Sequence, residues 1–306
     1  MVGGLSVWIG PAQEQAELQR ARAGRAAAIA CRHEDLATTA PEALRSVHIR
    51  LAELHRRSEE RHLTTARLHD AHVQRLTRWY SATDMESERP RLISAVAELV
   101  GARGAGLTLL GSERTEASSI ASGPLAAAAQ DLELTLGEGP VHDSTAAGLP
   151  VIATAASLAR RWPHYSPAVR ALGVHSLAVV PLGSGGRCVG ALAVFDPPDA
   201  DRPDPLTGDL EGLADALTHT MLLTEQCLGQ VIDASGTASA AYLLGSPNHR
   251  VVLHQAVGMV AAQCECSIED AFSLVRARAF ADDVPVTDVA RLIVDKRLRL
   301  DEDRDR

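Results

Sequence analysis

The sequence predicts an α+β protein: an N-terminal helical region, a central block with an antiparallel sheet and flanking helices, and a C-terminal three-helix module. Three observations support this fold class. Apolar residues recur at three- and four-residue spacing up to about residue 80, five short β-rich runs follow, and helical spacing returns after residue 247. We place the divisions at 1–80, 81–234 and 235–300, with a charged tail at 301–306.

The first region is predicted to be helical and to form a coiled coil. Residues 14–29 are rich in Ala and Arg, which favour helix. After Pro41 an apolar stripe runs to Trp79, and Ser58 and Thr65 interrupt it. An interrupted stripe suits either a two-helix hairpin or the stalk of a dimer, so we expect a homodimer through this region.

Four histidines recur every seven residues along the second half of this region: His48, His55, His62 and His69. They indicate either a pH-sensitive or metal-bridged seam, or a solvated flank whose ring bodies cover the apolar stripe. The flank is the favoured interpretation, because seven residues of helix separate such groups by ~10 Å, too far to share a metal within one chain.

The central block is predicted to pair short strands in antiparallel fashion between two helices, 91–100 and 206–232. Gly183-Ser-Gly-Gly186 is expected to be the turn of a hairpin. Residues 233–248 are rich in Ser, Gly and Ala and are expected to form a linker, with helix through 238–244. The expected strands are 105–110, 117–121, 150–153, 176–182 and 189–195.

Three amphipathic helices are predicted between residues 247 and 300. The first, 247–263, contains Gly258, which costs about 1 kcal/mol relative to Ala and is tolerated where a helix or a ligand approaches the backbone. The second opens at Ser267, where Asp270 is placed for a reciprocal cap. The third opens at Thr287, and basic residues in or beyond its last turns complement the helix dipole.

The order R-x-x-L-x-Q-A-x-G-M, S-I-E-D-A-F-x-L-x-R and V-x-D-V-A-R-x-I-V along these helices resembles the ANTAR domain. The resemblance implies an output module that binds RNA hairpins and prevents transcription termination. The family usually has Lys where this chain has Val257, so one cation for phosphate is missing. The RNA-binding candidates are Arg250, Gln255, Ala256, Gly258, Arg276, Arg278, Arg291 and Lys296. For Ala256 and Gly258, packing within the module is the alternative.

Five segments of the central block resemble a GAF domain, among them L-T-L-G-E-G-P-V-H-D at 134–143 and V-G-A-L-A-V-F at 189–195. The resemblance implies a PAS-like antiparallel sheet with helices on one face, often enclosing a small-molecule pocket. Candidate ligand contacts are Glu138, Gly139, Trp162, His164 and Tyr165; a structural turn and aromatic packing are the alternatives. Val141 stands where close relatives have Cys, so we expect no covalent cofactor and assign none.

The composition restricts the function further. The formal charge is −9, and from Ser246 onward nine Arg or Lys stand against eleven Asp or Glu, so RNA binding requires a local basic patch. No apolar run approaches the ~18 residues of a membrane span, and the start lacks the features of a secretion signal. Neither a catalytic motif nor the cysteine spacing of a metal site is found, so we expect a cytoplasmic protein that is not an enzyme.

These observations indicate a cytoplasmic sensor-regulator: the central domain receives a small-molecule or protein signal, and the C-terminal module binds RNA hairpin loops. The alternative is a protein-interaction scaffold whose diverged module no longer binds RNA, which Val257 and the acidic balance favour. A DNA-binding helix-turn-helix ranks lower, because six to eight residues are expected between the last two helices, around 281–286.

Overall fold

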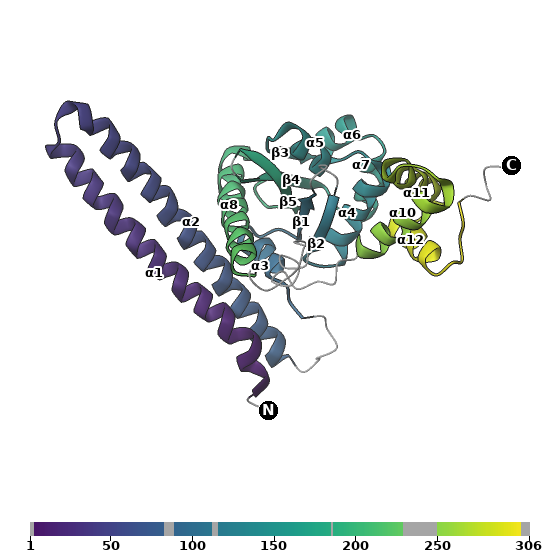
Figure 1. Cartoon of the computed structure of the whole chain (residues 1–306), viewed down its shortest axis with the longest axis horizontal. Helices are drawn as coiled ribbons and strands as arrows, with labels where there is room; N and C mark the ends of the chain where they lie inside the picture. Colours follow the sequence, from purple (N-terminus) through teal and green to yellow (C-terminus); the bar gives the residue numbers. More distant parts are fainter. Residues whose placement is uncertain (1–2, 83–88, 112–115, 185, 229–249, 301–306) are drawn as a thin grey trace.

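The computed structural model describes residues 3–82, 89–111, 116–184, 186–228 and 250–300 (Figure 1). The predicted linker at 233–248 and the charged tail at 301–306 lie outside the described residues. Along the chain the described parts are a long helical hairpin, a sheet domain and a three-helix module (Figure 1).

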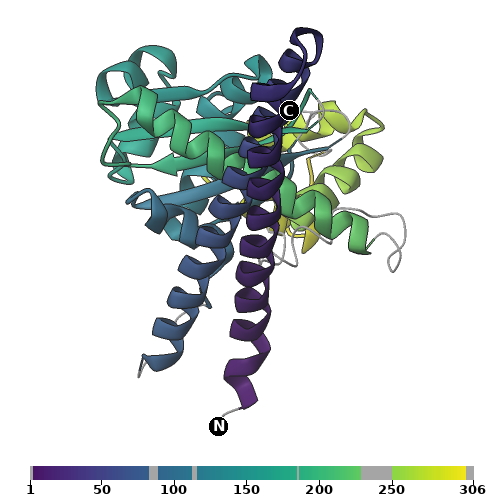
Figure 2. The same cartoon turned by 90° about the vertical axis from the view of Figure 1, so that its left-hand side faces the viewer.

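The hairpin consists of α1 (Gly3–Thr39) and α2 (Glu42–Ser81), which run antiparallel and carry their connecting end away from the sheet domain (Figures 1 and 2). Ala16, Ala23 and Ala30 recur at seven-residue spacing on α1 and are buried. Such small side chains allow the two helix backbones to approach closely. The helical prediction for this region is therefore confirmed, in its hairpin form.

The histidines of α2 lie at the contact between the two helices and not on a solvated flank, so the favoured interpretation was wrong. His62 and His69 are buried, and the His62 Nδ1 lies 2.7 Å from the Gln19 Oε1 of α1. His48 is half-buried beside His33 of α1, with their Nδ1 atoms 3.1 Å apart. In the part of α2 near the connecting end, Leu44, Val47 and Leu54 are instead exposed, whereas Leu68 and Leu76 are buried.

Burial keeps several of these imidazoles neutral. It lowers the pKa of His62 to about 4, with nearby His219 and Arg61 adding to the effect. It likewise lowers the pKa of His72 to about 4, with His69 and two arginines, Arg89 and Arg75, as further causes. Protonation of these groups therefore opposes the packing of α2 on the rest of the chain.

We expect the chain to lose stability in mild acid. Because the folded pKa values lie below the ordinary value of 6.5, the folded state binds fewer protons than the unfolded state, so stability is full above pH 6.5 and falls toward pH 4. The melting temperature should drop by roughly 5 °C or more between about pH 7 and pH 5. His72→Gln should reduce that drop, whereas the exposed His175→Gln should leave it unchanged; equal drops in both would contradict the assignment.

The sheet has five antiparallel strands in the order β2-β1-β5-β4-β3 (Figure 1). Its strands are β1 (Gly104–Leu110), β2 (Glu116–Ala121), β3 (Val151–Thr154), β4 (Ser176–Ser184) and β5 (Arg187–Phe195). All five expected strands are present, and β4 and β5 form the predicted hairpin, in which Ser184 pairs with Arg187.

Helices cover both faces of this sheet, so the expectation of helices on one face was wrong. One face packs on α2, α3 (Leu92–Leu99) and α8 (Pro203–Leu228) through residues such as Leu107, Val180 and Leu192. The other face packs on four short helices through Val179, Ala193 and Phe195. The alternation follows from the two-residue period of a strand, and it leaves the second helical layer facing the C-terminal module (Figure 1).

The sequence analysis did not predict the four short helices of this second layer. They are α4 (Pro124–Leu136), α5 (Pro140–Ala147), α6 (Ala155–Arg161) and α7 (Tyr165–Ala171). The signal for α4 was present: Pro124 occupies its first turn and Gly137 ends it in the left-handed conformation, φ 71°. The segments between the expected strands were interpreted as turns, so Pro124 and Gly137 were not recognised as the start and the end of a helix.

The C-terminal module packs α10 (Arg250–Cys264), α11 (Ile268–Asp282) and α12 (Val286–Val294) around a shared apolar core. The predicted cap of α11 is only half formed: the Ser267 Oγ accepts from the Asp270 N–H, but the Asp270 carboxylate accepts from the Ser267 hydroxyl and not from its amide. Three residues, not six to eight, separate α11 from α12, because Asp283 adopts the left-handed conformation at φ 54°. The three-residue connection between α11 and α12 has the length of the turn in a helix-turn-helix, so the expected longer connection was wrong.

Among the described residues no single helix is both long and apolar enough to cross a membrane. Only the bent pair Val251–Cys264 and Ile268–Asp282, at 108° to each other, meets the length and composition criteria together.

Candidate nucleic-acid interface and the domain junction

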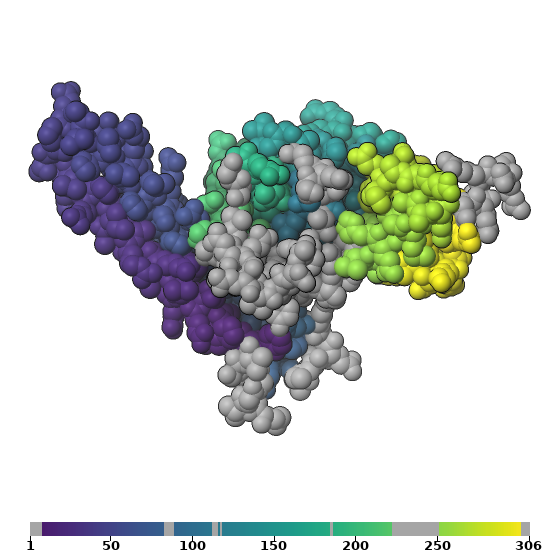
Figure 3. All heavy atoms as spheres, viewed as in Figure 1, coloured from purple at the N-terminus to yellow at the C-terminus, as the bar shows by residue number. Residues whose placement is uncertain are grey.

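Helix α4 of the sheet domain lies directly against α11 and α12, and we call this contact the α4 junction (Figures 1 and 3). Thr135 is its central polar residue. The Thr135 Oγ1 accepts from the buried Val286 N–H at 3.2 Å, and its carbonyl accepts from the Arg276 Nε at 3.4 Å. Leu134 beside it packs on the apolar core of the module. The junction thus combines apolar packing with directional bonds.

Arg276 reaches across the junction to Gly137, the residue that ends α4. A Cβ on Gly137 would lie 1.6 Å from the Arg276 Nη2, so any larger residue would displace that guanidinium, and the φ of 71° also favours glycine. The guanidinium lies 5.8 Å from the Phe272 ring centroid, and burial lowers the pKa of Arg276. Arg276 is therefore half-buried, with its guanidinium directed at the sheet domain.

A cavity of about 480 Å³ opens beside this contact. The sheet domain contributes polar side chains from β1, β2, α4 and α5, and the module contributes α10 and α11. Its lining includes Thr108, Glu116, Gln130, Glu133, His142, Thr145, His254, Val257, Phe272 and Arg276. A volume of this size suits a small molecule with both polar and apolar parts.

Glu133 is the titratable residue of this cavity whose pKa is moved most. Burial raises its pKa to about 8, and the neighbouring Glu116 and Asp143 add to the rise. Two backbone N–H groups at the start of α5 act in the opposite direction, and that of His142 donates to the Glu133 Oε1 at 2.7 Å. The carboxyl group is therefore largely protonated near neutral pH.

We expect Glu133 to make the fold less stable in alkaline solution. A carboxyl whose folded pKa is raised stabilises the fold fully below its ordinary value of 4.5, and this stability is lost as the pH rises through about 8. Because the residue keeps part of its surface exposed, the loss between about pH 6 and pH 9 should be roughly 1–2 kcal/mol. Denaturant unfolding of Glu133→Gln should lack this decrease; a decrease equal to that of the parent chain would show that another group causes it.

The predicted ligand contacts of the sheet domain do not line this cavity, although Gly139 lies against its Glu133. Trp162 is 2% exposed and Tyr165 is fully buried, both in the apolar cluster under α6 and α7. The Glu138 Oε1 accepts from the backbone N–H groups of His164 and Tyr165, which fixes the start of α7, and Gly139 is buried against Glu133. Trp162 to Tyr165 therefore belong to two short helices and their connection, and not to a segment without regular structure. Their geometry agrees with the packing alternative.

Comparison with models of protein families identifies two domains in the chain. Residues 84–221 match the model of the GAF domain, and residues 244–294 match that of the ANTAR domain. The protein therefore contains a GAF domain and an ANTAR domain. This combination of a sensor and an output domain is typical of regulators that are not enzymes. No curated protein sequence matches the chain.

The solved structures similar to this chain include two GAF domains and part of a methyl-accepting chemotaxis protein. The A. aeolicus nlh2 GAF domain in an inactive state is 13% identical over 52% of this chain and 98% of its own, with a TM-score of 0.34. The GAF domain of an Acinetobacter phosphoenolpyruvate-protein phosphotransferase is 13% identical over 54% and 96%, with a TM-score of 0.33. Residues 122 to 287 of a methyl-accepting chemotaxis protein are 15% identical over 46% and 90%, with a TM-score of 0.32.

The structure separates the predicted RNA-binding residues of the ANTAR domain into exposed and inaccessible ones. Gln255, Gly258 and Lys296 are exposed, and no atom lies within 4 Å of a Cβ added at Gly258. Ala256 is fully buried, so it packs within the domain. Arg250 begins α10, and its side chain lies outside the described residues.

The predicted cations mostly have carboxylate or junction partners. The Arg278 Nε donates to the Asp282 Oδ2 at 2.7 Å, and the Arg291 Nη1 donates to the Asp288 Oδ1 at 2.6 Å. Arg276 is held at the α4 junction. Each pair joins two residues of a single helix, α11 for Arg278 and α12 for Arg291, and is partly exposed, so it contributes little to stability.

One exposed aromatic residue of the ANTAR domain escaped the sequence analysis. Phe280 on α11 is 63% exposed, although it is one of only three phenylalanines in the chain. Its helical neighbours Ser273, Ala277 and Ala281 are exposed and small. The available signal was the position of Phe280, which lies out of step with the buried Ala271, Val275 and Ala279.

Proposed function

We propose that the protein is a signal-dependent RNA-binding regulator of transcription termination, in which the GAF domain controls access to the ANTAR domain. The observation that supports this most is the placement of Arg276, a candidate RNA contact that is half-buried at the α4 junction and bonds to the Thr135 carbonyl. Opening of the junction would release this guanidinium from the Thr135 carbonyl and expose it more fully to phosphate.

The second candidate cation near α4 is Arg291. It lies at the edge of a further cavity between α12 and the GAF domain, next to Asp288. Arg276 and Arg291 thus come from different helices of the ANTAR domain and both face the GAF domain. We propose that the described arrangement is the closed state, and that hairpin loops of RNA bind the open one.

The signal would act at the cavity beside Glu133. Its lining joins the GAF residues Glu133 and His142 to Phe272 and Arg276 of the ANTAR domain. A ligand that fits only one of the two arrangements shifts the equilibrium between them by its difference in affinity. We assign the candidate small-molecule site to this cavity rather than to the region of Trp162 and Tyr165.

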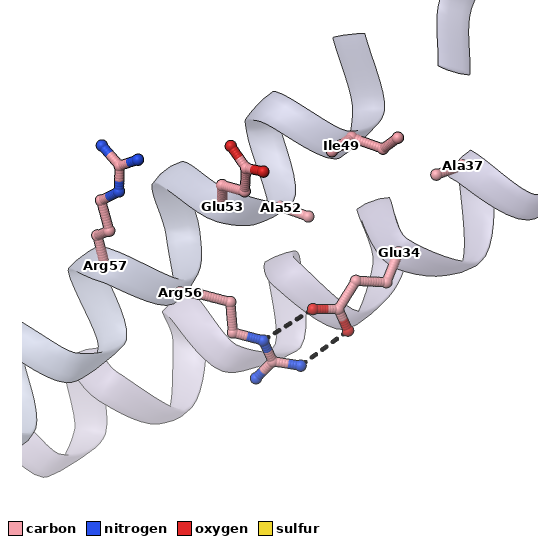
Figure 4. A pocket seen from close by; sticks show the side chains of 7 residues that line it. All are labelled: Glu34, Ala37, Ile49, Ala52, Glu53, Arg56 and Arg57. Atoms are coloured by element: carbon pink, nitrogen blue, oxygen red, sulfur yellow. Dashed lines mark hydrogen bonds and ion pairs between the residues drawn. The ribbon is translucent and has the colours of Figure 1, made fainter. Parts of the chain in front are cut away.

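A homodimer through the hairpin would place two ANTAR domains on one RNA. Near its tip a groove of about 520 Å³ lies between α1 and α2, with Ile49 and Ala52 on one wall (Figure 4). The Arg56 guanidinium of α2 makes two 2.8 Å bonds to the Glu34 carboxylate of α1 beside it (Figure 4). Exposed apolar side chains continue along this part of the hairpin: Ile29, Leu36, Leu44, Val47, Ile49 and Leu54. We propose that a second copy of the hairpin covers them.

The direct test is binding of the full chain to a library of transcripts with two adjacent stem-loops and randomised loops. We expect enrichment of a loop sequence, binding that weakens as salt rises, and a chain that is dimeric by light scattering. The carboxylate pairs of Arg278 and Arg291 favour the alternative, a protein-interaction scaffold. The scaffold would be the better assignment if no loop is enriched at low salt and a stoichiometric protein partner copurifies without RNA.

A further inference from the structure

A second cavity, of about 530 Å³, surrounds the N-terminal half of α4, whereas the cavity beside Glu133 adjoins its C-terminal half. Three parts of the chain form its walls: the end of α2, the GAF domain and the start of α12. Its lining includes Arg75, Arg89, Arg91, Ser94, Ser119, Ser122, Gly123, Pro124, Asp131, Thr287, Asp288 and Arg291.

Positive charge dominates this lining. Four arginines from three separate segments meet two acids, Asp131 and Asp288. Arg75 bonds Glu98 at 3.0 Å and Arg291 bonds Asp288, but a guanidinium carries five N–H donors, so a single carboxylate does not use them all. Within the described part of the chain, the Arg75 Nε is buried and makes no hydrogen bond. Donors therefore remain for an anion.

Two helix N-termini add to the positive potential. Helix α4 begins after Gly123 and α12 begins after Pro285, and neither of these two cap residues has a side chain that accepts from a backbone N–H. The first N–H of α12, that of Val286, donates to the Thr135 hydroxyl, so the next amide of α12 and the first amides of α4 are the ones left for an anion. Residues of both first turns line the cavity: Pro124 from α4, and Thr287 and Asp288 from α12. Helix starts direct backbone N–H groups and partial positive charge at anions. Three serines also line the cavity, although the Ser94 hydroxyl already donates to the Ser122 carbonyl and the Ser122 Oγ accepts from the Ala105 N–H.

We propose that this cavity binds a small phosphate-bearing molecule that carries at least two negative charges. Its volume fits a nucleotide-sized ligand, and its walls join α2, the GAF domain and α12, so a bound anion would hold these three parts together. The site would thereby stabilise the closed state. Binding of the anion would require Arg75, Arg89, Arg91 and Arg291, which line the cavity, and would not require that the protein binds RNA.

The probe for this site is inorganic pyrophosphate, titrated calorimetrically into the full chain at low salt, with chloride at equal ionic strength as the blank. We expect saturable binding, one molecule per chain, and a melting temperature that rises with pyrophosphate. Arg89→Gln and Arg291→Gln should each weaken binding roughly tenfold or more, since each removes a charge-assisted contact. Arg160→Gln on α6 is the matched control, because Arg160 is exposed and does not line the cavity.

Several outcomes would overturn the proposal. Absence of saturable heat would do so, as would equal affinities in the parent chain, both variants and the control. The Arg291 side chain is 55% exposed, so its substitution should leave the fold intact and keep that comparison valid. Unstructured RNA without stem-loops that displaces pyrophosphate stoichiometrically would identify a nucleic-acid backbone as the source of the phosphate and overturn the small-ligand assignment; retention of pyrophosphate in its presence supports the assignment. Hairpin RNA is not used for this comparison, because a ligand of the open state would weaken pyrophosphate binding without sharing its site.

Discussion

Thr135→Val should open the α4 junction and raise the affinity of the full chain for hairpin RNA. The substitution keeps the size of the side chain but removes the oxygen that accepts from the Val286 N–H, which is buried. A buried N–H without an acceptor costs about 1–3 kcal/mol, and this cost disappears when the junction opens. The equilibrium should therefore move toward the open state by roughly fivefold to a hundredfold.

Thr135→Ser is the matched control, because it keeps the hydroxyl group and loses only a methyl group. Binding is measured by gel shift with the selected hairpin RNA, and junction opening by hydrogen exchange of α4, α11 and α12. We expect faster exchange and tighter RNA binding in Thr135→Val, and values near those of the parent chain in Thr135→Ser. If exchange accelerates but RNA affinity does not increase, the closed state does not limit RNA binding.

The contacts of the α4 junction could not be predicted from the sequence, although the strands could. Hydrophobic spacing is a local property, so it located the strands closely: the expected strand 176–182 is β4, Ser176–Ser184. The junction depends on pairs such as Thr135 and Val286, which are 151 positions apart. Nothing in the local pattern near either residue indicates the other. Gly137 likewise reads as an ordinary turn residue until Arg276 is seen to occupy the space of its missing Cβ.

Burial was the other property that the sequence left undetermined. The seven-residue spacing of the histidines is compatible with either side of a helix, and the contact with α1 decided which side is buried. Val257 is a similar case. Its substitution for the usual Lys was interpreted as the loss of a cation for RNA, but the residue is buried in the ANTAR core and lines the cavity at the junction. A lysine there would have to extend into that cavity.

Phe280→Ala should weaken binding of hairpin RNA roughly tenfold, and by a similar factor at every salt concentration. An aromatic side chain that is 63% exposed contributes little to the core, so the melting temperature should hardly change. Unpaired loop bases stack on such rings, and removal of one ring costs about 1–3 kcal/mol per stacked base. Val251→Ala is the control, since Val251 is also an exposed apolar residue of the ANTAR domain.

Arg278→Gln on the same helix should behave differently. It removes a charge that is available to phosphate once Asp282 is displaced, so the dependence of log K on log salt should become shallower by about one phosphate contact. The two variants should therefore differ in the plot of log K for RNA binding against log salt. Phe280→Ala should shift the whole line without changing its slope, whereas Arg278→Gln should change the slope. If neither variant differs from the Val251→Ala control, α11 does not contact RNA. The exposed residues of α10, Gln255 and Gly258, would then have to provide the contact.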